Sequence, residues 1–199
     1  MEREYRAVSN PLLPTENQKR LDSNFYVEGY ATTFTRYLLW EWDGIKYYEE
    51  IDPAALQNAD REDVIMQYDH TGKVLARLGN GSLGLEVDSK GLFVFADLSK
   101  STAAKELYEE IAAGLVTQMS WAFTVERDSF HRLDDSTRLR RIEQIRKVYD
   151  VSAVSIPANS DTEINARNFA HKSFEDFERD SISLKIRKLN LKIKMGVQQ

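Results

Sequence analysis

The chain has 199 residues, of which 42% are hydrophobic and 30% are charged, and its formal net charge is −5. This length suits one domain with a real core, or one domain with tails, and the composition is typical of a soluble globular protein. No apolar run approaches the roughly 18 to 20 residues that a membrane span needs, and the N-terminal residues lack the apolar stretch of a signal peptide. We therefore expect a cytoplasmic protein that does not enter a membrane.

The residue types present narrow the possible chemistry. The chain has no cysteine, so disulfides, thiolate metal sites and a cysteine nucleophile are excluded, and its histidines are only His70, His131 and His171. We expect no metal and no cofactor. The acidic net charge argues against a specific nucleic-acid binder, but it is unevenly spread, since residues 181–199 carry five basic side chains and no acid, which leaves −10 for residues 1–180.

The first part of the chain is dominated by strand patterns. Asp43-Gly44 is the residue pair that a two-residue hairpin prefers, and Asp52-Pro53 is a typical helix N-cap followed by proline at the first helical position. The predicted elements, in chain order, are an N-terminal arm over residues 1–23, strands over 24–31, 36–42, 45–51 and 63–68, and a short helix beginning after Asp52. The strand over 63–68 ends directly before Asp69 and His70.

The second part contains one clear helix between strands. Ser101 or Thr102 can cap it, and Gly114 is a plausible stop. The predicted elements are a meander of three antiparallel strands over 73–98, the helix, a strand over 118–125, an exposed hairpin loop over 127–137, and strands over 139–147 and 149–156. We expect an α+β domain over residues 24–167, built as a mostly antiparallel β-barrel flanked by helices. An acidic and then basic tail over 168–199 follows, which fits a helix or a strand equally well.

Three side chains at predicted strand ends could act together in catalysis. Ser120 lies near the start of a strand whose Trp121 and Phe123 point to the opposite face. A serine hydroxyl becomes a good nucleophile only when a base removes its proton and a third group orients that base. His70 and Asp150 are the candidates for these two roles. An ordinary half-buried serine and a structural histidine remain the alternatives at this point.

An ordered series of motifs resembles the prohead serine proteases of tailed bacteriophages, over about residues 25 to 167. The series is Glu28-Gly29-Tyr30-Ala31, Tyr48-Glu49-Glu50-Ile51-Asp52-Pro53-Ala54-Ala55-Leu56, Tyr68-Asp69-His70, Gly81-Ser82-Leu83 through Lys90-Gly91-Leu92, Met119-Ser120-Trp121-Ala122-Phe123, and Asp150-Val151-Ser152 through Ser155-Ile156-Pro157-Ala158-Asn159. The resemblance implies a fold like that of the herpesvirus assembly proteases, a β-barrel surrounded by helices.

The resemblance also implies roles for individual residues. His70 would be the general base and Ser120 the nucleophile, with backbone amides near Ser120 as oxyanion donors. The family usually has a glutamate where this chain has Asp150, so the third member could instead be Glu143 in the preceding predicted strand. The family often has glycine where this chain has Ala122, which shares a face with Ser120 and would narrow the site.

The implied function is capsid maturation. The resemblance implies a serine endopeptidase that cuts the scaffolding segment of the phage major capsid protein, and also itself, inside the prohead in the host cytoplasm. The tail over 168–199 would be a self-cleavage or prohead-packaging segment, or a solubilising or partner-binding tail without processing. Two other functions stay open: an inactive scaffold or capsid assembly module on the same fold, and a host hydrolase on a similar barrel.

Overall fold

The computed structural model describes residues 3–15, 19–155 and 160–196. The chain divides into two compact units, Met1–Glu163 and Ile164–Gln199. The first contains the sheets and one helix, and the second consists of most of a long helix, α2 (Ser160–Gly196). The predicted boundary at residue 168 falls inside this helix, close to the division between the units.

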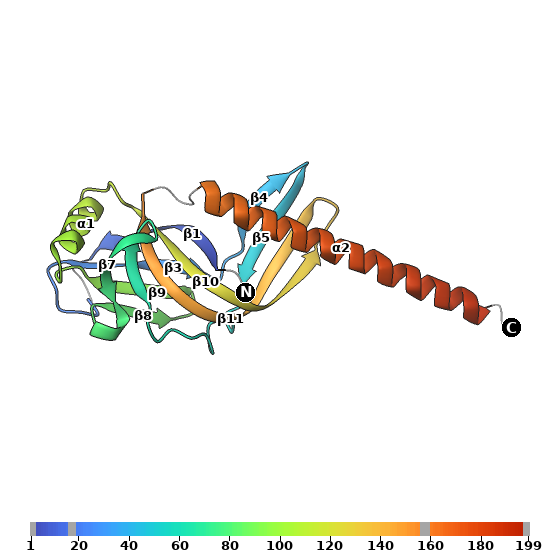
Figure 1. The fold of residues 1–199 in the computed structure, drawn as a ribbon, viewed down its shortest axis with the longest axis horizontal. Coiled ribbons are helices and arrows are strands. Elements are labelled where there is room, and N and C mark those ends of the chain that lie inside the picture. The colour runs from blue at the N-terminus through green and yellow to red at the C-terminus, as the bar shows by residue number, and fades with distance from the viewer. Residues whose placement is uncertain (1–2, 16–18, 156–159, 197–199) are drawn as a thin grey trace. The chain divides into compact units, whose positions relative to one another are not determined.

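The first unit is built mainly of strands (Figure 1). They are β1 (Glu4–Pro11), β2 (Leu13–Pro14), β3 (Tyr26–Thr33), β4 (Tyr37–Trp42), β5 (Ile45–Ile51), β6 (Ile65–Tyr68), β7 (Thr71–Arg77), β8 (Leu83–Val87), β9 (Gly91–Asp97), β10 (Gln118–Arg132) and β11 (Thr137–Val154). A 3₁₀ turn, η1 (Leu78–Asn80), follows β7, and the helix α1 (Thr102–Ala112) precedes β10.

The long hairpin of β10 and β11 organises the larger of two sheets. Its main path runs β1-β10-β11-β5-β4, and β6 and β7 join it through β11. The first part of β11 pairs in parallel with β5, and a later part, from Asp150 to Ala153, pairs in parallel with β6. Most other pairs are antiparallel, as predicted. The strand β11 therefore pairs with two different strands, β5 and then β6, along the same edge.

The predicted barrel is wrong. Within the described residues the strands form a seven-stranded sheet and a separate four-stranded sheet of order β2-β3-β9-β8, and neither closes on itself. Both sheets keep edge strands, such as β1, which pairs only with β10 in the larger one. The α+β class is confirmed.

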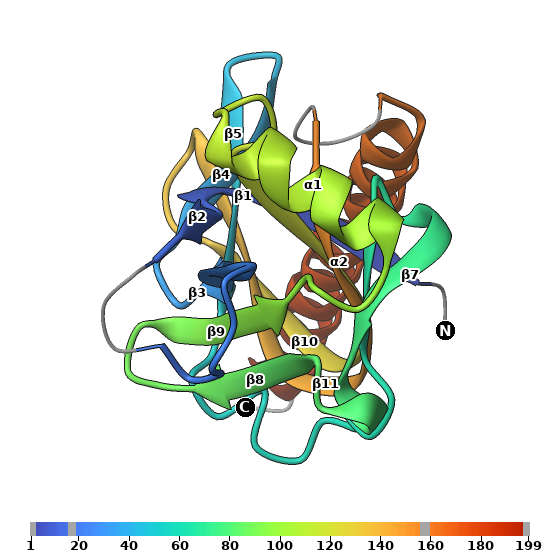
Figure 2. The ribbon, with the colours of Figure 1, turned by 90° about the vertical axis from the view of Figure 1, so that its left-hand side faces the viewer.

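The core lies where both sheets and α1 contribute apolar side chains. Trp121 and Phe123 of β10 are fully buried, as are Val27 of β3 and Val94 of β9. The helix α1 contacts β2 and β7 (Figure 2) and buries Leu107 in the same cluster. The face of β10 that carries Trp121 is therefore a structural face, which leaves the other face available for chemistry.

Several local predictions are confirmed. β4 and β5 form the hairpin expected around Asp43 and Gly44, whose φ angles of 48° and 72° are those of a tight two-residue turn. The helix α1 begins after Ser101, whose hydroxyl accepts a hydrogen bond from the Ala104 amide at 3.1 Å. Gly114 adopts the left-handed conformation expected just beyond the helix end, with φ 73°.

The segment after Asp52 forms turns and not the predicted helix. The Asp52 carboxylate does accept a hydrogen bond from the Ala54 amide at 2.8 Å, as an N-cap would. The next amides, however, bond three residues back, as from Ala55 to the Asp52 carbonyl at 2.8 Å. The Ala55 carbonyl accepts a hydrogen bond from the Ile145 amide of β11 at 3.0 Å, whereas the Ala59 amide, its partner in an α-helix, donates to the Leu56 carbonyl at 3.4 Å. A tertiary hydrogen bond overrides the local capping signal.

Three other predictions about strands need correction. Residues 4–14 of the predicted arm hold β1 and β2, and Leu12 between them is fully buried. The meander over 73–98 is divided, because η1 and Gly81 redirect the chain so that β7 pairs with β6 and not with β8. The predicted loop over 127–137 is mostly strand. The last two predicted strands, over 139–147 and 149–156, form the single strand β11. Ile156 and the motif Pro157-Ala158-Asn159 lie outside the described residues.

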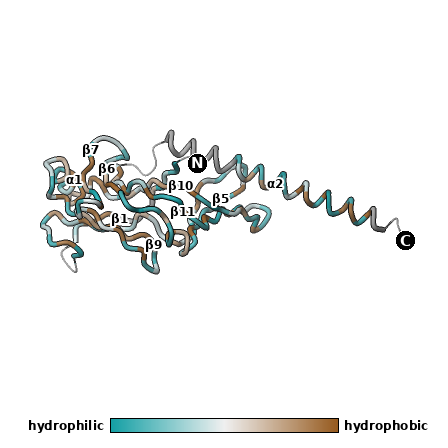
Figure 3. The backbone as a smooth tube through the Cα atoms, turned by 60° about the horizontal axis from the view of Figure 1, so that its bottom comes forward, coloured by the Kyte–Doolittle hydropathy of each residue, from teal (hydrophilic) through white to brown (hydrophobic). Residues whose placement is uncertain are grey.

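The tail that fitted a helix or a strand is helical. In the coloured part of α2, hydrophobic and hydrophilic residues alternate along the helix (Figure 3). No helix in the described part of the chain is both long and apolar enough to cross a membrane.

Candidate active site

Ser120 lies on a strand that is paired on both sides. Its neighbours are Ala7 of β1 and Ser152 of β11, and Ala122 next along the face lies opposite Asp150. Residues directly opposite in antiparallel strands share a face, so Ser120, Ser152, Ala122 and Asp150 all lie on one side of the sheet. Trp121, on the other side, is fully buried in the core. The predicted alternation of β10, with Trp121 on one face and Ser120 and Ala122 on the other, is confirmed.

His70 is placed by a tight turn between β6 and β7. Asp69 and His70 are its two central residues, and their φ angles of 48° and 58° are left-handed, as a type I′ hairpin turn requires. The Asp69 carboxylate accepts hydrogen bonds from the amide and hydroxyl of Ser155 at 3.0 and 2.9 Å, and its amide donates to the Ala153 carbonyl at 2.9 Å. The turn is therefore tied to the end of β11, on the strand that carries Asp150.

The three predicted residues meet through their side chains. The Nε2 atom of His70 lies 2.6 Å from the Ser120 Oγ atom, and its Nδ1 atom is hydrogen-bonded to Oδ1 of Asp150. Ser120 and Asp150 are buried, and His70 is mostly so. An imidazole between a serine hydroxyl and a carboxylate can accept the hydroxyl proton while the carboxylate orients the ring and stabilises its charged form.

Asp150 reaches the imidazole although its side chain is one methylene shorter than that of the glutamate that the resemblance led us to expect. Glu143 does not take this place, because it lies in the exposed part of the hairpin, where it accepts hydrogen bonds from Ser129 at 2.7 Å and from Arg127 at 3.0 Å. The hydrogen bond from Ser129 is the main reason why the pKa of Glu143 is lowered. The geometry thus brings Asp150, and not Glu143, to His70.

Two further residues contact the site, and neither was predicted from the sequence to take part in it. The hydroxyl of Ser152, fully buried, donates a hydrogen bond to Asp150 Oδ1 at 2.8 Å, the same oxygen that contacts His70. The ring of Tyr5 in β1 meets the His70 ring edge-on, with centroids 4.8 Å apart. The Asp-x-Ser spacing on one strand would have indicated Ser152, but nothing local to Tyr5 indicates its contact.

A buried charge network fixes β1 beside the site. Arg6 donates to Glu49 of β5 at 2.7 Å, and Arg140 of β11 donates to Glu49 at 3.0 Å and to Glu4 at 2.6 Å. Burial by itself would raise the pKa of Glu49, but the charges of Arg6 and Arg140 outweigh it and lower that pKa from 4.5 to about 2. The network joins three strands and positions the residue before Arg6, Tyr5, against His70.

The backbone of β10 offers no free amides for an oxyanion hole next to the nucleophile. From Ser120 to Ala122 the strand is paired with both β1 and β11. In an antiparallel strand with two partners, successive amides donate alternately to one neighbour and the other. The expectation that amides near Ser120 stabilise the oxyanion is therefore not supported for residues 120–122.

A buried serine, a histidine and an acid in this arrangement are typical of serine hydrolases. Ser120, His70 and Asp150 of this α+β domain have that arrangement. The chain belongs to the caudovirus prohead serine protease family, whose model matches residues 13–177 of 199. No curated protein and no solved structure matches it. The resemblance found in the sequence is thereby confirmed.

Proposed function

We propose that this protein is a serine endopeptidase of phage capsid maturation, and that Ser120, His70 and Asp150 are its catalytic residues. The observation that carries this proposal is the position of His70, which bridges the Ser120 hydroxyl and the Asp150 carboxylate. Membership of a prohead serine protease family supports the biological setting. The proposed substrates are the scaffolding segment of the major capsid protein and the protease itself, inside the prohead in the host cytoplasm.

The proposed reaction is acyl transfer. His70 Nε2 accepts the Ser120 proton as Oγ attacks a peptide carbonyl, and the protonated imidazole then donates that proton to the departing amine. Asp150 Oδ1 keeps the ring in orientation and balances its charge. A water molecule, deprotonated by His70, then releases the acyl group and regenerates Ser120. The oxyanion donors in this proposal come from outside residues 120–122.

One finer expectation stays within this proposal. Self-cleavage that removes the tail over residues 168–199 is part of the same proposal. An inactive assembly module is the competing function, and the intact contacts between Ser120, His70 and Asp150 favour the enzyme.

The test is the intact mass of the protein and of its co-expressed capsid protein, with wild type compared with Ser120→Ala. We expect shortened species in the wild-type sample that are missing with Ser120→Ala. Ser129→Ala is the matched control, because Ser129 is hydrogen-bonded to Glu143 and not to His70. Full-length masses in assembled proheads for all samples would contradict the proposal and favour the assembly module.

A further inference from the structure

An exposed apolar stripe runs along the second half of α2. Ile182, Ile186, Leu189 and Ile193 follow one another at intervals of four, three and four residues, which places them on one face of the helix. Each is more than half exposed. A helix is stabilised mainly by burying such a face, and isolated helices in water are marginal. This stripe is therefore suited to a partner.

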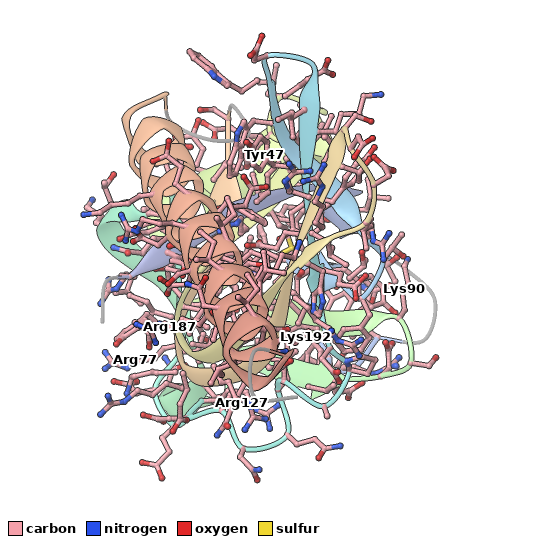
Figure 4. The ribbon with its side chains drawn as sticks, turned by 90° about the vertical axis from the view of Figure 1, so that its right-hand side faces the viewer. Tyr47, Arg77, Lys90, Arg127, Arg187 and Lys192 are labelled. Atoms are coloured by element: carbon pink, nitrogen blue, oxygen red, sulfur yellow. The ribbon has the colours of Figure 1, made fainter. Side chains whose placement is uncertain are left out.

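Basic side chains border the stripe. Lys185 and Lys192 each precede a stripe residue by one position, which places them along its edge, and Arg187 and Lys188 lie further around the helix. Figure 4 labels Arg187 and Lys192 on this helix. No acidic residue occurs from 181 to 199. A partner that covers the stripe therefore meets positive charge.

The charge pattern argues against a second copy of the chain as the partner. If two copies paired their stripes, Lys185 and Lys192 of one would approach the same basic segment of the other, and like charges across a helix pair are destabilising. An antiparallel pairing that matched the acidic stretch at 175–180 with the basic one would move the stripes out of register. A partner with an apolar stripe flanked by acids satisfies both features at once.

We propose that residues 182–193 of α2 form a docking surface for an acidic amphipathic helix of another protein. The partner presents Leu-type side chains to the stripe and carboxylates to Lys185 and Lys192. Leu184 and Leu191 are also exposed, but each follows a stripe residue, Ile182 or Leu189, by two positions. Two positions correspond to about 200° of rotation, so both leucines lie on the opposite side of the helix. The docking surface does not depend on proteolytic activity.

The proposal is tested with the full chain carrying Ser120→Ala, which prevents cleavage. The probe is a fluorescent peptide of heptads with Leu at the a and d positions and Glu at the flanking positions, and its binding is measured by anisotropy. One control peptide has the same composition in scrambled order, and another has Lys in place of Glu. We expect binding of the acidic amphipathic peptide only.

Variants of the chain separate the two features. Ile186→Ser with Leu189→Ser is expected to weaken binding by at least about tenfold, because both remove buried area. Leu184→Ser with Leu191→Ser, on the opposite side, is the matched control and should leave binding unchanged.

Charge reversal and self-association complete the test. Lys185→Glu with Lys192→Glu should abolish binding of the acidic peptide and allow binding of the Lys peptide. Three outcomes overturn the proposal: equal binding of the scrambled acidic peptide, no binding of any peptide, or sedimentation of the chain alone as a dimer that the stripe variants dissociate.

Discussion

Replacing Asp150 by asparagine tests the assignment of the third catalytic residue. Both contacts of the carboxylate, from His70 and from Ser152, fall on one oxygen, Oδ1. An asparagine can keep its own oxygen in that position, so both hydrogen bonds can persist while the negative charge is lost. Asp150→Asn therefore isolates the contribution of charge from that of orientation.

The magnitude follows from the charge that forms during reaction. Once His70 takes the proton, its imidazolium lies beside the carboxylate, and at about 4 Å and an effective dielectric constant of about 20 the attraction is worth about 4 kcal/mol. Losing it should slow the reaction of Ser120 by roughly a thousandfold. Asp150→Ala also removes the hydrogen bonds and should react more slowly still, by about another factor of ten.

The assay is the rate at which a fluorophosphonate probe labels Ser120, which needs no knowledge of the natural substrate. Glu143→Gln is the matched control, because this half-buried acid is hydrogen-bonded to Ser129 and Arg127 and not to His70. It should label at the wild-type rate. The reasoning is refuted if Asp150→Asn labels as fast as wild type, or if Glu143→Gln is slowed as much.

Three further predictions concern positioning and stability. Ser152→Ala should slow labelling of the serine by roughly tenfold with little change in unfolding midpoint, since it removes one hydrogen bond to Asp150. Because the pKa of Glu49 is lower in the folded protein, the ionised carboxylate stabilises the fold fully above about pH 4.5, and this stabilisation is lost as the pH falls toward 2. The stabilisation is on the order of 3 kcal/mol. Glu49→Gln should therefore flatten the acid limb of a plot of unfolding free energy against pH. Gly91→Ala should lower the free energy of unfolding, measured in urea, by about 1 to 3 kcal/mol, because a Cβ there would lie 2.0 Å from a backbone carbonyl oxygen of β3. Gly84→Ala should cost less, since its Cβ would meet the movable end of an aromatic ring; an equal loss at both positions would contradict this explanation.

The sequence by itself determined the features whose chemistry lies within a few residues. The Asp43-Gly44 turn, the Ser101 cap of α1 and the alternation of β10 around Ser120 were all predicted correctly, because turn geometry, capping and the two-residue period of a strand are local properties. The motif order also identified the family, and it predicted His70 and Ser120 as catalytic residues. A local pattern could not choose between two acids on one strand.

Only the tertiary structure decided which groups meet. The parallel pairing of β6 with β11 brings His70 to Asp150 and leaves Glu143 in the exposed hairpin. β1 was predicted as an arm, because its burial depends on partners more than forty residues away, such as the Glu49 carboxylate that binds Arg6. Strand partners and register follow from the simultaneous packing of many side chains, and no short stretch of sequence contains that information.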